Sequence, residues 1–139
     1  MKTTITYLLL TFAFLANAQD GILDTSFGTN GKIDYSFFST FVDMKVDNGK
    51  MIALGKHTDG NPLLVRFNLD GTLDTTFDND GIKIVDFGKD SETPASFAIM
   101  NHSNGYAYLV ASSISGEIAK IMEDGSFSSS FGTNGILVQ

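Results

Sequence analysis

Residues 70–81 read DGTLDTTFDNDG, and two more copies of this block occur, DGILDTSFGTNG at residues 20–31 and DGSFSSSFGTNG at residues 124–135. Their starting positions lie 50 and then 54 residues apart. A repeat period near fifty residues in a chain of short strands is typical of propellers and similar arrays. The block therefore predicts a chain built from copies of one structural unit.

The segments between the blocks have the pattern of short β-strands joined by tight turns. Nine of the fourteen glycines directly follow Asn or Asp, which tolerate the positive φ of hairpin turns. Side chains alternate between apolar and polar, as where Val42, Met44 and Val46 alternate with charged neighbours. We expect strands at residues 32–37, 41–47, 50–57 and 63–69, and again at residues 82–87, 96–102, 106–112 and 117–123.

Four antiparallel strands per unit correspond to one blade of a β-propeller. The predicted fold class is all-β: antiparallel four-stranded blade repeats forming a partial β-propeller, about two blades plus the first strand of a third. The units cover roughly residues 20–69 and 70–123, with a partial unit at 124–139. Two blades are too few to close a ring. The chain is therefore expected to be a fragment of a longer protein, with a homo-oligomer that completes the ring as the alternative.

Each block combines two apolar residues four positions apart with turn-forming residues. We predict that the apolar pair fills the space between adjacent blades, where burying one Phe contributes roughly 1.5–3 kcal/mol. The short polar residue between them is suited to an Asx-type turn, and the glycine lets the chain enter the next strand. These structural residues are Leu23, Asp24, Phe27 and Gly31, then Leu73, Asp74, Phe77 and Gly81, and finally Phe127, Ser128, Phe131 and Gly135.

The acidic residues of the second block have a second interpretation, which is calcium binding. Asp78-Asn79-Asp80-Gly81 resembles part of a calcium loop, but no glutamate stands at the twelfth position. The other two copies replace both carboxylates with other residues. Turn formation is therefore the favoured role, and a calcium-dependent adhesion module stays an alternative.

The first eighteen residues have the pattern of a secretory signal peptide. Lys2 supplies the positive start, residues 7–15 are apolar, and residues 16–18 end in a small-x-small cleavage pattern. The apolar run is too short to span a membrane as a helix. We therefore expect an exported protein comprising residues 19–139, secreted, periplasmic or on the cell surface, with no transmembrane anchor.

The exported part would be acidic and would contain no cysteine. It holds 8 basic and 16 acidic residues, a net charge of −8, which repels phosphate backbones and argues against nucleic acid as a partner. Without cysteine, stability must come from packing and strand pairing rather than disulfides.

No set of residues in the sequence forms a known catalytic or metal-binding motif. His57 and His102 lack the spacing of a zinc site, and no G-x-S-x-G elbow is present. Asp86, Asp90 and Glu92 are candidates for a carboxylate pair acting on glycosides, although a solvated acidic loop is the simpler interpretation. We expect no catalytic residue, metal or cofactor, with part of a polysaccharide-active enzyme as the alternative.

One aromatic cluster is a candidate binding site. Phe37, Phe38 and Phe41 lie in the link between the first two predicted strands. The corresponding region of the second unit, residues 88–96, contains no aromatic residue. If exposed, these rings would stack on a sugar or a protein partner, and if buried they would join neighbouring blades.

The order of these elements resembles the delta-60 repeat family. Residues 48–55 (NGKMIALG) and 65–68 (VRFN), followed by the block, match the order of that family's repeat. The resemblance covers residues 19–139 and implies a secreted or cell-surface β-propeller-like module without catalytic residues, acting as a scaffold or binding domain. The second unit departs from the pattern, since Lys120 stands in place of Arg66 and the third block lacks the Leu-Asp pair.

Overall fold

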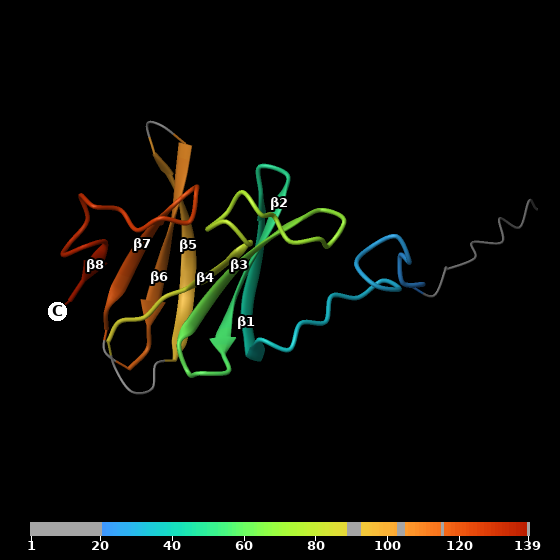
Figure 1. The fold of residues 1–139 in the computed structure, drawn as a ribbon, viewed down its shortest axis with the longest axis horizontal. Coiled ribbons are helices and arrows are strands. Elements are labelled where there is room, and N and C mark those ends of the chain that lie inside the picture. Colours follow the sequence, from blue (N-terminus) through green and yellow to red (C-terminus); the bar gives the residue numbers. More distant parts are fainter. Residues whose placement is uncertain (1–20, 89–92, 103–104, 115, 139) are drawn as a thin grey trace, which may run out of the picture.

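The structure is a computed structural model that describes residues 21–88, 93–102, 105–114 and 116–138. The predicted signal peptide lies outside these residues. Within them the chain forms strands and no helix, arranged as two four-stranded antiparallel sheets (Figure 1). The first sheet contains β1 (Phe38–Asp47), β2 (Lys50–His57), β3 (Pro62–Asn68) and β4 (Ile82–Ile84), and the second contains β5 (Pro94–His102), β6 (Gly105–Ser112), β7 (Ile118–Met122) and β8 (Ile136–Leu137).

In both sheets the strands lie side by side in the order of the sequence, which confirms the predicted all-β class and the four-stranded antiparallel blade. The sheets are nevertheless out of phase with the units read from the sequence. The strand predicted to open the second unit is β4, which completes the first sheet by pairing Ile84 with Leu63. Likewise β8 pairs with β7 and completes the second sheet, instead of opening a third blade.

Residues 32–37, predicted as a strand, form none. Lys32 makes only isolated bridges to Gly28 and Thr29. In the repeat, the residues after Gly31 correspond to those after Gly81, which form β4 by pairing with β3. No counterpart of β3 stands beside residues 32–34 in the described part of the chain, so this segment lacks the neighbour that would make it a strand.

The interior strands are buried on both sides because they separate two cores. Along β2, Ile52 and Leu54 face the second sheet, whereas Met51 and Ala53 face away from it. The buried residues between the sheets, here called the inter-sheet core, are Ile52, Leu54, Leu64, Phe77, Val85, Phe87, Phe97, Tyr106, Tyr108, Val110, Ala119 and Ile121. Those on the other side of the first sheet, the outer core, are Met51, Ala53, Leu63, Val65 and Phe67.

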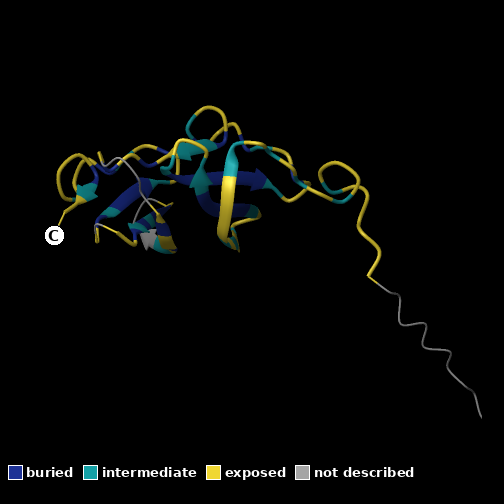
Figure 2. Cartoon of the chain, turned by 90° about the horizontal axis from the view of Figure 1, so that it is seen from below, coloured by how far each residue is buried: buried dark blue, intermediate teal, exposed yellow. Residues whose placement is uncertain are grey.

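The outer core is covered by the N-terminal segment rather than by a sheet. Phe27, Ile33, Tyr35 and Phe37 from this segment pack on it and are partly buried. Figure 2 shows that buried residues concentrate in the strands, while much of the N-terminal segment is exposed. The segment leaves part of the sheet uncovered, and Met44 and Val46 in β1 remain 48% and 63% exposed.

The aromatic residues of the three blocks occupy corresponding positions at different depths. Phe77 is fully buried in the inter-sheet core, where its ring meets that of Tyr108 edge to face at 5.7 Å. Phe27 packs on the outer core in the corresponding way, and Phe131 is only partly buried. Leu73 does not accompany Phe77, because it packs on the outer core and bridges to Phe67. The apolar pair therefore serves two cores, not the single space that we predicted.

We expect Phe77→Ala to lower the free energy of unfolding by about 3–5 kcal/mol, because it removes a fully buried ring from the core that joins the sheets. The matched substitution Phe131→Ala should cost about 1 kcal/mol, since that ring is only partly buried. Urea denaturation followed by circular dichroism measures both values. Equal losses for the two variants would contradict the role assigned to Phe77.

Candidate functional site

A single guanidinium connects the first sheet, its block and the second sheet. Arg66 in β3 is 3% exposed, and its Nε donates to Oδ2 of Asp74 at 2.7 Å. Its Nη2 donates to Oγ1 of Thr76 at 2.9 Å, and its Nη1 donates to the backbone carbonyl of Glu123 at 2.6 Å. The guanidinium also lies 4.9 Å from the centre of the Phe77 ring. Arg66 thus holds the block in place and ties it to the end of β7.

Asp74 is the acidic partner of this arrangement. It is 3% exposed and also pairs with Lys50, whose Nζ lies 3.1 Å from Oδ2. Burial alone raises the pKa of Asp74, but hydrogen bonds from Thr76 and Lys50 and the charge of Arg66 outweigh it, so that the pKa falls to about 2. For Arg66, burial lowers the pKa, yet Tyr108, Asp74 and Tyr106 together raise it above the ordinary value. Both groups are therefore charged at neutral pH.

Consecutive blocks are also joined by a backbone hydrogen bond. The N–H of Gly28 donates to the carbonyl of Asp70 at 2.7 Å, and the N–H of Asp78 donates to the carbonyl of Asp124 at 2.8 Å. The donor is in each case the residue after the block phenylalanine. A Cβ at Gly71 would lie 2.9 Å from the Gly28 nitrogen, and one at Gly125 would lie 2.5 Å from the Asp78 nitrogen. The residue after the accepting aspartate is glycine because the backbone of the preceding block leaves no room for a side chain there.

The acidic residues of the blocks mostly stabilise turns. Oδ1 of Asp24 accepts hydrogen bonds from the N–H and hydroxyl of Ser26, and those bonds lower the pKa of Asp24. Oδ1 of Asp74 accepts the same two bonds from Thr76. In the third block the corresponding side chain, Ser128, lies 3.3 Å from the hydroxyl of Ser130.

The two carboxylates of the candidate calcium loop point to separate partners. Asp78 pairs with Lys83 at 3.2 Å, and Asp80 accepts the N–H of Ile82 at 2.8 Å. In the part of the chain that the structure describes, no three His, Cys, Asp or Glu side chains are grouped as metal ligands would be. Of the candidate glycosidase carboxylates, Asp86 accepts the N–H of Gly88 at 2.7 Å, and Asp90 and Glu92 lie outside the described residues.

A cavity of about 510 Å³, here called the aromatic groove, lies on the open side of the first sheet. It lies between the N-terminal segment and β1, over the outer core. Its walls are apolar, and Asp34, Ser39 and Thr40 supply the polar groups. The apolar residues that line this aromatic groove are Phe27, Ile33, Tyr35, Phe38, Phe41, Met44, Ala53 and Phe67.

The three phenylalanines proposed to stack on a ligand come together beside this groove. Phe41 is 57% exposed, whereas Phe37 and Phe38 are partly buried. Phe38 lies between the other two, with its ring centre 5.1 Å from that of Phe37 and 6.3 Å from that of Phe41. Tyr35, which the sequence interpretation missed, stacks on Phe37 at 4.9 Å with an angle of 16° between the rings.

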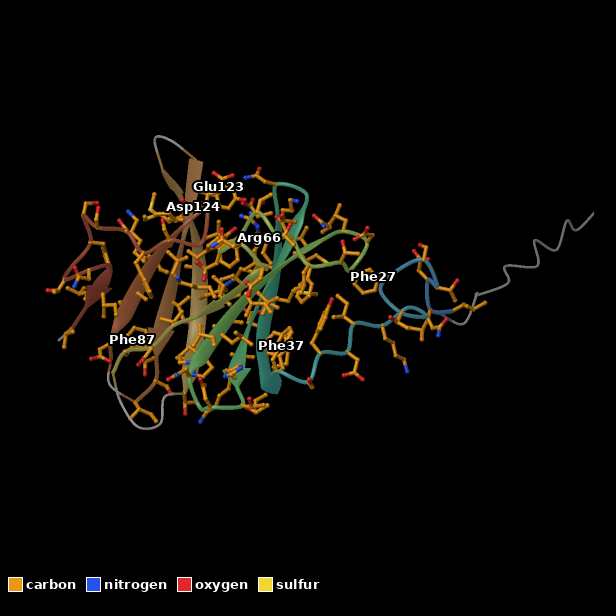
Figure 3. The ribbon with its side chains drawn as sticks, viewed as in Figure 1. Phe27, Phe37, Arg66, Phe87, Glu123 and Asp124 are labelled. Carbon is orange, nitrogen blue, oxygen red and sulfur yellow. The ribbon has the colours of Figure 1, made fainter. Side chains whose placement is uncertain are left out.

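A second, polar cavity of about 400 Å³ lies at the junction of the sheets, where Arg66, Thr76, Tyr106, Glu123 and Asp124 line it together with Met122. Figure 3 shows Arg66 close to Glu123 and Asp124, while Phe27 and Phe37 lie toward the N-terminal side of the first sheet. The sequence interpretation did not link Arg66 to β7. The eight-residue spacing of Arg66 and Asp74 is a signal for their own pairing, but it does not indicate the contact with Glu123.

Comparison with known proteins supports a propeller-type repeat. Residues 47–77 match a family described as a beta-propeller domain of unknown function, DUF5122. The matched stretch runs from the end of β1 to Phe77 and therefore includes Lys50, Arg66 and Asp74. No curated protein matches the chain significantly, and no solved structure does. No helix in the described ranges is long and apolar enough to cross a membrane.

The low pKa of Asp74 predicts how stability depends on pH. Because the folded-state pKa of about 2 lies below the ordinary 3.8, the stabilisation is complete above the unfolded-state pKa and is lost as the pH falls through the folded-state value. The advantage of the wild type over Asp74→Asn in unfolding free energy should therefore shrink by about 2 kcal/mol between roughly pH 6 and pH 2.

Urea titrations at several pH values measure this difference. Asp24→Asn is the matched control, because it removes the corresponding carboxylate of an exposed turn and should show a weaker dependence on pH. A difference between wild type and Asp74→Asn that stays constant over this pH range would contradict the assignment.

Proposed function

We propose that this chain is a non-catalytic, exported repeat module of the delta-60 type, which acts as a scaffold or binding domain for a protein or a glycan. The observation that carries the proposal is the aromatic groove, an open concave surface of stacked rings with a few polar groups beside it. Ligand sites commonly combine an apolar lining with a few polar groups that orient the ligand. Aromatic side chains supply a large contact area to such a partner.

The roles of the charged residues favour binding over catalysis. Arg66, Asp74 and Lys50 form one ion-paired group that holds the block, and Asp78 pairs with Lys83. A catalytic acid or base must instead reach a substrate. Asp74 is enclosed by the side chains that hold it, and the aromatic groove has Asp34 as its one acidic lining residue. A lone carboxylate does not supply the pair on which most glycosidases depend.

Binding of polysaccharides tests the proposed use of the aromatic groove. We expect at least one polysaccharide of a soluble panel to retard the wild type in affinity gel electrophoresis. Phe41→Ser should bind that polysaccharide at least about tenfold more weakly, because the exposed ring is removed. Ile114→Ser, which removes an apolar residue of comparable exposure from the loop after β6, should bind like the wild type.

The same incubations distinguish the enzyme alternative. Release of reducing ends from a bound polysaccharide would overturn the non-catalytic assignment. Equal retardation of Phe41→Ser and the wild type would overturn the assignment of the groove.

Export makes a separate prediction about the mature N-terminus. If residues 1–18 are a signal peptide, the protein recovered outside the cytoplasm begins at Gln19, because cleavage follows the small residue Ala18. Mass spectrometry of the intact protein from a fractionated host measures this end directly. Recovery of the whole chain from Met1 in the cytoplasmic fraction would contradict export.

A further inference from the structure

The first and third blocks contain the same five residues in the same conformation. Both read Phe-Gly-Thr-Asn-Gly, at residues 27–31 and 131–135. The φ angles agree closely, with 55° and 53° at the first glycine, 54° and 53° at the asparagine, and 82° and 88° at the second glycine. Each turn is closed by a threonine N–H that donates at 2.8 Å to the residue after the second glycine. The two segments are therefore interchangeable in shape and in chemistry.

Only the first of these segments is docked on the block that follows it in the chain. Its Phe27 packs on the outer core, and its Gly28 N–H donates to the carbonyl of Asp70. In the third block, Phe131 is as partly buried as Phe27 but packs on neither core, and the Gly132 N–H makes no hydrogen bond within the described part of the chain. The surface that binds the first copy, formed by the outer core and the Asp70 carbonyl, is here called the socket. The second copy of the pentapeptide has the shape to bind there too.

The first sheet has apolar surface left over beside that socket. Phe41, Met44 and Val46 are 57%, 48% and 63% exposed. The last two share a face with Ala53 and Met51, as their pairing shows. The corresponding face of the second sheet is covered by the first sheet, and the two form the inter-sheet core. A preceding sheet would cover this face of the first sheet in the same way. The N-terminal segment alone covers it incompletely.

The second sheet presents a complementary face at the other end of the molecule. Ile118 in β7 pairs with Ala111 and with Leu137, so these side chains share the face opposite to the inter-sheet core, where Leu137 is 44% exposed. Lys120 has the backbone environment of Arg66, since its N–H donates to Gly135 as that of Arg66 donates to Gly81. Within the described residues, Nζ of Lys120 makes no hydrogen bond or ion pair.

We propose that copies of this chain associate head to tail, with the third block of one molecule seated on the first sheet of the next in place of that molecule's own first block. Phe131 takes the place of Phe27, and the Gly132 N–H donates to the Asp70 carbonyl. Lys120 reaches the carbonyl of Leu69, as Arg66 reaches the carbonyl of Glu123. The first block therefore acts as an internal competitor that partly covers the socket.

Such contacts are heterologous, so they lead to a closed ring or an open filament. The inference rests on the proposed function, because it names a second copy as the partner of the open face. Each exported chain carries a net charge of −8, and the copies repel one another at low ionic strength. Association should therefore strengthen as salt is added.

Size-exclusion chromatography with light scattering, over a concentration series of the exported chain, tests the proposal. The wild type should form oligomers, and Phe131→Asp and Met44→Asp should each weaken association at least about tenfold, because each introduces a charge into one half of the contact. Ile114→Asp, in the loop after β6, should associate like the wild type. Circular dichroism checks that every variant keeps its β-structure.

Mixing provides the decisive comparison. Phe131→Asp retains an intact first sheet and Met44→Asp retains an intact third block, so the two variants together should form a dimer that neither forms alone. A monomeric wild type at high concentration would overturn the proposal, as would variants that oligomerise normally or a mixture without heterodimer. Polysaccharide binding is read separately on monomeric Phe131→Asp, whose aromatic groove is unaltered, so that the proposed function stands or fails independently.

Discussion

The structure depends on the junction where the block of one repeat meets the block of the next. Three kinds of interaction coincide there: the burial of Phe77 between the sheets, the bond from the Asp78 N–H to the Asp124 carbonyl, and the charged contacts of Arg66. Each is supplied by residues within or just before the block. A repeat that carries these residues therefore brings its own means of attachment to the following one. This explains why the block, which forms little regular structure, is the most repeated part of the sequence.

Arg66 is a costly group to place at such a junction, because removing a guanidinium from water carries a large desolvation penalty. The penalty is offset by Asp74, Thr76 and the carbonyl of Glu123, which together use all three nitrogen atoms of the guanidinium. Their directions fix how the block is oriented on β3 and where β7 ends. Apolar packing alone would join the sheets with less control over their relative placement. The buried charges therefore contribute to the specificity of the junction as well as to its stability.

Much of the fold could be predicted from the sequence because its signals are local. Strand alternation and Asn-Gly turns predicted the pairs of β1 with β2 and of β5 with β6, and Asn48 and Gly49 do adopt the positive φ of a tight hairpin turn. The phase of the sheets could not be read in this way. Whether Ile82–Ile84 ends one sheet or begins another depends on which neighbour it pairs with, and pairing is not encoded in the strand itself. The same reason explains residues 32–37, which have the sequence of a strand without a partner strand beside them.

The candidate site was predictable to a similar degree. Phe37, Phe38 and Phe41 could be singled out because they are close in sequence, whereas Tyr35 and Phe67 join them only through the packing of the N-terminal segment on the outer core. Register was a further limit. Aligning the Asn-Gly pairs places Ile52 with Tyr108. In the structure, however, Arg66 lies opposite Ile52 and Lys120 lies opposite Leu109. A one-residue shift of this kind exchanges the two faces of a strand.

The second repeat lacks the ion pair that Arg66 and Asp74 form in the first. Lys120 and Ser128 occupy the places of Arg66 and Asp74, so the carboxylate and the forked guanidinium are absent together. Losing both avoids leaving a buried aspartate without its cation, which would cost more than the pair contributes. The backbone bonds that seat the block on its strand are retained, because Ser128 donates its N–H to Lys120 as Asp74 does to Arg66. The block therefore keeps its fold without the charged pair. What the second repeat lacks is a buried guanidinium that contacts the next sheet, as Arg66 contacts the carbonyl of Glu123. Lys120 keeps a single flexible cation at that place, where Arg66 presents a planar group whose donors have fixed directions.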